Sequence, residues 1–144
     1  KAMLEGLEDA GSIIAYNKSF EIGVIKKLAE FDPKNRKKLL ALIDRFVDPL
    51  PIFREAVYHP DFLGSFSIKS VAPALIGEHL SYDDLEIGNG SDAQSVANQI
   101  MIGNIKGKEL DAAIESLLIY CRQDTMAMVE LVNWLFEKSK KGIA

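Results

Sequence analysis

Two short apolar stretches constrain the fold of this chain most strongly. The first, SIIAY at residues 12–16, is rich in β-branched residues and predicts a buried strand. The second, FVDPLP at residues 46–51, predicts an extended piece. This piece is short, because its two prolines have no N–H to donate to a sheet. A helical pattern follows each stretch, and this order favours parallel strands joined by a crossover. We therefore expect an α/β protein with few strands.

Most of the remaining sequence predicts helix. Residues 17–31 begin with Asn17, positioned as an N-cap, and carry apolar residues at helical spacing: Phe20, Val24, Leu28 and Phe31. The stretch from about 108 to 140 is longer than the usual helix of roughly 8–20 residues, so we expect a bend near Tyr120. Further helical patterns, some of them only a turn or two, cover residues 2–11, 34–46, 52–57, 67–77 and 92–103. The expected fold is mostly helical, with five or six helices and a few short parallel strands.

A sheet built from only two strands is marginal, so we expect another segment or another chain to extend it. Without that extension the SIIAY strand would expose an apolar edge, and exposed edges recruit other strands. The sequence therefore predicts self-association through this strand edge.

Composition narrows the function classes. The 144 residues carry a net charge of −4, which argues against a general polyanion binder but not against a nuclease with an acidic, metal-loaded site. Six Lys and Arg residues within 26–38 would either steer a phosphate backbone or, as is usual for charge runs, form a solvated surface. The single cysteine allows no internal disulfide, and no run of 18 apolar residues occurs. These features predict a cytoplasmic protein without a membrane partner.

Two pairs of polar residues are candidates for chemistry. Tyr120 and Asp124 are four residues apart in a helical pattern, so they share one helix face beside an apolar stripe. Asn17 and Glu21 open a helix just after the first strand, where open α/β sheets place their active sites. Structural explanations exist for both: a solvated carboxylate beside an amphipathic tyrosine, and an N-cap followed by an acid that favours the helix dipole.

These motifs resemble those of the DEDD exonucleases, RNase H-like 3′–5′ exonucleases. AYNKSFE resembles their second motif, which has an Asn, a Phe and then an acid, and YCRQD resembles their third motif in its Tyr form. SFSIKSVAPALIG resembles the helix after the fifth strand of the family, and FVDPLP resembles that strand. The likeness extends from about residue 11 to 137 and is greatest to a bacterial branch with Glu in the second motif. It implies that residues 1–144 are the C-terminal portion of a single RNase H-like domain, a truncated fold.

The resemblance implies hydrolysis of phosphodiester bonds by a two-metal mechanism, with single-stranded DNA or RNA as substrate. Four carboxylates would hold two Mg²⁺ or Mn²⁺ ions. Asp124 would ligate the ion that binds the attacking water, Tyr120 would orient that water, and Glu21 would help to hold the other ion. Asn17 would fix the strand-to-helix turn or touch substrate, and Phe20 would be buried support for the helix that bears Glu21.

The sequence departs from the family pattern in two places. Glu21 stands where the second motif normally has Asp, and the first motif, D-x-E on the first strand, is absent. The sequence Asp84-Leu85-Glu86 lies in a Gly- and Asn-rich loop between the other motifs and cannot replace it. We therefore expect two of the four carboxylates to lie before Lys1 and the 144 residues alone to be inactive.

Two alternatives stay open. Lys69 lies near a helix start, where backbone N–H groups could bind phosphate, and is a candidate for substrate binding. A non-catalytic nucleic-acid or protein-binding module with an RNase H-like fold is the rival to an exonuclease, and the change from Asp to Glu at position 21 favours this rival slightly.

Overall fold

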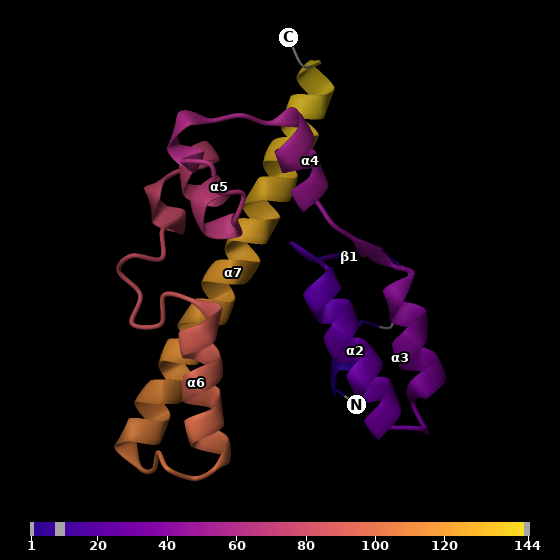
Figure 1. Ribbon diagram of the computed structural model, residues 1–144, viewed down its shortest axis with the longest axis vertical. Helices are drawn as coiled ribbons and strands as arrows, with labels where there is room; N and C mark the ends of the chain where they lie inside the picture. Colours follow the sequence, from indigo (N-terminus) through magenta and orange to yellow (C-terminus); the bar gives the residue numbers. More distant parts are fainter. Residues whose placement is uncertain (1, 8–10, 143–144) are drawn as a thin grey trace. The chain divides into compact units, whose positions relative to one another are not determined.

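The computed structural model describes residues 2–7 and 11–142, and the chain divides into two compact units, Lys1–Tyr58 and His59–Ala144. Figure 1 shows the elements of each unit. The first unit contains α1 (Ala2–Gly6), β1 (Ile13–Ile14), α2 (Ser19–Phe31), α3 (Arg36–Ile43), β2 (Phe46–Val47) and α4 (Leu50–Ala56). The second contains two 3₁₀ helices, η1 (Pro60–Phe62) and η2 (Glu78–Leu80), and three α-helices, α5 (Ile68–Leu75), α6 (Gly90–Met101) and α7 (Lys108–Lys141).

The two strands of the first unit pair in parallel, as the order of strand and helix patterns predicts. Ile13 lies opposite Phe46, and Ile14 lies opposite Val47. Backbone bonds from Ile13 N to Arg45 O and from Ala15 N to Val47 O, 2.8 and 3.1 Å long, extend the ladder at both ends. The helices α2 and α3 form the crossover between the strands. This strand–helix order places the first turn of α2 just beyond the carboxyl end of β1.

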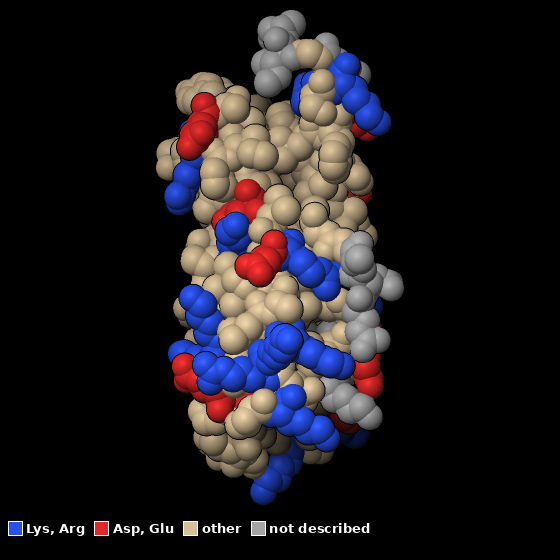
Figure 2. All heavy atoms as spheres, turned by 90° about the vertical axis from the view of Figure 1, so that its right-hand side faces the viewer, with Lys and Arg blue, Asp and Glu red and all other residues tan. Residues whose placement is uncertain are grey.

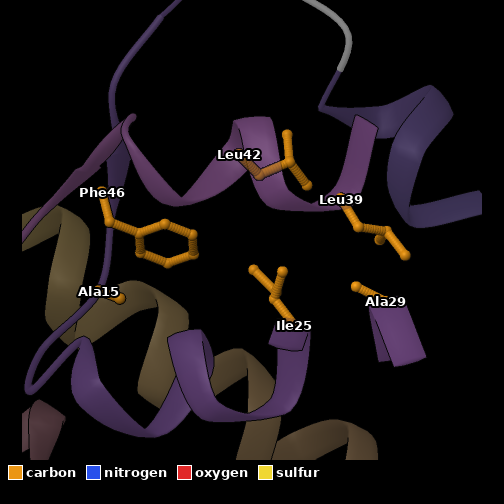
Figure 3. Packing of buried hydrophobic residues seen from close by; sticks show 6 residues of the cluster. All are labelled: Ala15, Ile25, Ala29, Leu39, Leu42 and Phe46. Carbon is orange, nitrogen blue, oxygen red and sulfur yellow. The ribbon is translucent and has the colours of Figure 1, made fainter. Parts of the chain in front are cut away.

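The core of the first unit lies between the strands and the two crossover helices (Figure 3). In that view the side chains of α2 and α3 point toward one another, with the strand residues at one end of the cluster. Its buried members are Ala15, Ile25, Ala29, Leu39, Leu42 and Phe46. The small Ala29, 2% exposed, lets α3 approach α2 closely.

The buried face of α2 differs from the predicted one. Phe20 and Phe31 are 73% and 85% exposed, so the prediction that Phe20 is buried support for the helix is wrong. The helix carries two apolar stripes, and Ile25 and Ala29 face the core while the stripe of larger side chains faces outward. Spacing alone cannot choose between two apolar faces, because both repeat with the helical period.

The second unit is built on α7, a single unbroken helix of 34 residues. The helix continues through Tyr120, where the sequence suggested a bend. Its first half packs along α6, and its second half contacts α5 and η2. Its fully buried residues, Ala127 and Leu131, belong to the same unit as the buried Val71 and Ala72 of α5.

Across the described residues the chain is mostly helical, with seven α-helices and one two-stranded parallel sheet. The mostly helical balance is as predicted, although the described residues form seven α-helices where five or six were expected. None of the described helices combines the length and the apolar character that a membrane crossing requires.

Candidate functional site

The turn between β1 and α2 is held by a carboxylate from the other strand. Asp48 follows β2, and its two oxygens accept hydrogen bonds from the backbone N–H groups of Asn17 and Lys18, both at 3.0 Å. Asp48 Oδ1 also accepts a 3.0 Å bond from the N–H of Leu50 at the start of α4. One charged side chain thus satisfies three backbone donors that helix and strand leave unpaired, which fixes the strand-to-helix turn.

Asn17 occupies this turn but is not the N-cap of α2. Its φ of 62° is in the left-handed region, which Asn tolerates better than most residues. The residue at the N-cap position is Lys18, which makes no side-chain cap. The side-chain oxygen of Asn17 instead accepts a 2.8 Å bond from Ser19 Oγ. The two roles that the resemblance implies for Asn17, fixing the turn or touching substrate, stay predictions.

Glu21 lies in the first turn of α2, directly after this braced turn. Its oxygen Oε2 has no access to solvent and no hydrogen-bond partner among the described residues. An oxygen in that condition costs free energy, because it is neither hydrated nor hydrogen-bonded. A cation at this oxygen would remove that cost.

Asp124 projects from the middle of α7 between two phenols. Tyr82, in the loop after η2, donates a 2.7 Å hydrogen bond from its hydroxyl to Asp124 Oδ1. Tyr120, one turn before Asp124 on the same helix, packs edge-on to the Tyr82 ring, with 6.1 Å between the ring centroids. The predicted pairing of Tyr120 with Asp124 on one face is therefore present, with Tyr82 as a third member.

Lys69 of α5 belongs to the same cluster. Its ammonium lies 4.9 Å from the centroid of the Tyr82 ring and 5.3 Å from that of the Tyr120 ring. It also donates a hydrogen bond to the carbonyl oxygen of Gly88. Lys69 is the second residue of α5, so it lies near a helix start as predicted, and two aromatic rings and a carbonyl contact its ammonium.

The loop that carries Tyr82 is tied to α7 at further points. Gln123 Nε2 donates to the carbonyl oxygens of His79 and Ser81, at 3.1 and 3.0 Å. Ser116 Oγ donates to Glu86. Glu86, the last residue of the D-x-E sequence in this loop, is therefore an anchor of the loop on α7. These bonds hold Tyr82 against Asp124 from both sides.

The pKa values of both phenols, Tyr82 and Tyr120, are raised, so both keep their protons to a higher pH than a free tyrosine does. Burial, followed by the negative charge of Asp124, raises the pKa of Tyr120 from 10.0 to about 12. Burial and the hydrogen bond to Asp124 raise the pKa of Tyr82 as well. A phenol that keeps its proton can donate to the carboxylate or to a water beside it.

A pocket of ≈ 850 Å³ opens beside this cluster. Lys69 and Tyr82 line it together with hydroxyl and carboxylate side chains from η1, α5 and the loop before α6. Among these polar lining residues are Ser65, Ser70, Glu78, Ser81, Asp83 and Asn89.

The two carboxylates that the resemblance assigns to metal binding belong to different units, Glu21 to the first and Asp124 to the second. The structure therefore builds the two halves of the predicted site separately. Within residues 2–7 and 11–142, no group of three or more His, Cys, Asp or Glu side chains is placed to hold an ion. The carboxylate oxygens of Glu21 and Asp124 are hard donors of the kind that Mg²⁺ and Mn²⁺ prefer. Each residue therefore fits a partial metal site.

Sequence reasoning missed Tyr82 and Asp48. Tyr82 lies in a loop 42 residues before Asp124, and no periodic pattern links the two. Asp48 stands directly before Pro49 in FVDPLP, and its place directly after a strand is the one signal that indicated a functional carboxylate. The same rule that singled out Glu21 after β1 applies to Asp48 after β2.

Residues 1–67, which include the whole first unit, match a family described as a domain of unknown function (DUF2779). The chain is 30% identical over 141 residues to a protein of Ureaplasma parvum named Uncharacterized protein UU173, covering 87% of this chain and 20% of that protein. It is 26% identical over 142 residues to Uncharacterized protein MG366 of Mycoplasma genitalium, covering 91% and 21%. The chain thus spans about a fifth of the length of these relatives. No solved structure matches it.

Proposed function

We propose that this chain is the C-terminal part of an RNase H-like domain in a metal-dependent 3′–5′ exonuclease that hydrolyses single-stranded DNA or RNA. The observation that carries the proposal is the state of Glu21 Oε2, a carboxylate oxygen without solvent or a hydrogen-bond partner among the described residues. The setting of Asp124, between two protonated phenols, supports it from the other unit.

In this proposal Glu21 and Asp124 hold Mg²⁺ or Mn²⁺, with the remaining carboxylates supplied from outside these 144 residues. When bound, the two ions lower the pKa of a water and stabilise the charge that develops on the leaving oxygen. Tyr82 engages Oδ1 of Asp124, so Oδ2 would be the oxygen that holds an ion. The pKa of Tyr120 is raised to about 12, so its phenol keeps its proton at neutral pH. It orients the attacking water by donating or accepting a hydrogen bond.

Asp48 and Tyr82 act as positioning residues for the two carboxylates. Asp48 braces the turn that precedes Glu21, through its bonds to the N–H groups of Asn17 and Lys18. Tyr82 fixes the orientation of the Asp124 carboxylate through its 2.7 Å bond. Groups that orient metal ligands typically change metal affinity by about 10–100-fold when they are removed.

The test is hydrolysis of a 5′-labelled single strand by the full-length protein with Mn²⁺. Products that shorten one nucleotide at a time from the 3′ end, lost in Asp124→Asn and Glu21→Gln, support the proposal. Asp111→Asn, an exposed acid on the same helix α7, is the matched control and should retain activity. Residues 1–144 alone should be inactive. Degradation that survives Asp124→Asn, or no degradation by the full-length protein, contradicts the proposal.

A non-catalytic binding module is the second candidate. Glu in place of Asp at position 21 favours it. Such a module would bind a single strand without shortening it and would not respond to Mn²⁺. A gel shift of the same labelled strand, run beside the hydrolysis assay, separates the two functions, because the first reads binding and the second reads cleavage.

A further inference from the structure

Six cationic side chains gather at one end of the hairpin formed by α2 and α3, and we call this region the basic end. Residues 26–38 contain six Lys and Arg against two acids, a local net charge of +4 in a chain whose total is −4. Figure 2 shows Lys and Arg side chains collected on the face that carries α2 and α3. The members are Lys26, Lys27, Lys34, Arg36, Lys37 and Lys38.

Within the described part of the chain, none of these six side chains is paired. All six are exposed, and none forms an ion pair or side-chain hydrogen bond with a described residue. By contrast, Lys18 and Lys69 donate hydrogen bonds to the carbonyl oxygens of Phe46 and Gly88. The cations of the basic end are therefore available to an external anion.

Helix stability does not explain this arrangement. The first turn of α3 contains Arg36, Lys37 and Lys38 and no acid. Cations at the positive end of a helix destabilise it, whereas acids there stabilise it. A partner with negative charge would offset this repulsion.

An exposed aromatic ring stands among these charges. Phe31, the last residue of α2, is 85% exposed. Lys27 lies four residues earlier, so the two side chains share one helix face. A ring that projects between cations combines the two elements by which proteins bind single strands: a surface on which a base stacks and charges that follow the phosphates.

We infer that the basic end is a binding surface for single-stranded nucleic acid, with phosphates held by the lysines and Arg36 and a base stacked on Phe31. The inference does not depend on hydrolysis, since a binding module would use the same surface. An anionic lipid surface would attract the same cations. The outward stripe of α2, which includes the exposed Phe20 and Phe31, leaves an apolar face free, so binding to anionic vesicles is the competing outcome of the test.

The test measures binding of a fluorescent oligothymidylate of about 20 nucleotides by fluorescence anisotropy. The buffer contains EDTA, so that no metal contributes. Lys37→Glu/Lys38→Glu places acids in the first turn of α3, which favours the helix, so lost binding cannot be blamed on unfolding. Lys106→Glu/Lys108→Glu is the matched control, because it makes the same charge change at the start of α7.

We expect Lys37→Glu/Lys38→Glu to weaken binding at least tenfold and to reduce the slope of log affinity against log salt by about 1.4, the value for two phosphate contacts. Phe31→Ala should weaken binding about fivefold or more, because stacking on one base is lost. The control should bind within about twofold of wild type. Equal loss in both double variants, no binding by wild type at low salt, or preferential binding to anionic vesicles would overturn the inference. Binding without cleavage by the full-length protein would contradict the exonuclease but leave this surface intact.

Discussion

Tyr82 donates a 2.7 Å hydrogen bond to Asp124 Oδ1 across 42 residues of sequence. Tyr82 is 5% exposed, and its ring packs against Tyr120 and the ammonium of Lys69. This bond connects the loop after η2 to the middle of α7 at the carboxylate that we propose as a metal ligand. The bond also has a charged acceptor, and such bonds contribute more to stability than neutral ones.

Tyr82→Phe should therefore destabilise the protein by about 1–3 kcal/mol, because it removes one donor and leaves the ring in place. Urea unfolding followed by circular dichroism measures the change. Tyr58→Phe is the matched control, since Tyr58 is 86% exposed and should change stability little. Equal stability of Tyr82→Phe and wild type would show that the bond contributes nothing.

Alkaline pH should destabilise the protein through its raised tyrosine pKa values. Tyr16 and Tyr120 titrate at about 12 in the folded state, chiefly because they are buried, compared with 10.0 in the unfolded chain. Above pH 10 the unfolded chain loses these protons first, so the stability present below pH 10 is lost as the pH rises toward 12. Urea unfolding at pH 8 and pH 11 should show this loss.

The control for this pH effect is Tyr82→Phe/Tyr120→Phe, which has two fewer raised phenols. Its stability should fall less between pH 8 and pH 11 than that of wild type. Tyrosinate absorbance should also rise at higher pH in the folded protein than in guanidinium. Superimposable titrations of folded and unfolded protein would contradict the raised pKa values.

Asp48→Ala should destabilise the first unit by about 2–4 kcal/mol, because three backbone N–H groups lose a charged acceptor. Urea unfolding again provides the measurement. Asp44→Ala is the control, because Asp44 is an exposed acid at the C-terminal end of α3, where a negative charge is unfavourable. If both variants lose the same stability, Asp48 does not brace the turn.

The helices and strands were more predictable from the sequence than the face that each helix buries. The strand–helix order gave the parallel pair of β1 and β2, because a crossover joins strands in that way. The face of α2 was not predictable, since Phe20 and Ile25 belong to two apolar stripes and only the partner helix selects one. The unbroken length of α7 was also missed, because contacts with α5 and α6 stabilise it and these are not visible in its own sequence.

The candidate site was predictable where its residues are neighbours in sequence. Tyr120 and Asp124 share a face because helical spacing places them there. Tyr82 reaches Asp124 only through the folding of a loop, which is anchored by Gln123 and Lys69. Asn17 was expected as an N-cap, but Asp48 pairs with the backbone of the turn instead, and that contact spans 31 residues.

The most direct test of the proposed site is anomalous scattering from Mn²⁺ in crystals of the full-length protein. We predict two peaks about 4 Å apart, as in other two-metal sites, with Glu21 and Asp124 both among the ligands. Asp124→Asn should remove at least one peak while Asp111→Asn preserves both. Two results would contradict the assignment as an exonuclease. One is manganese bound elsewhere, and the other is a folded protein in which Glu21 and Asp124 lie too far apart to bind the same two metal ions.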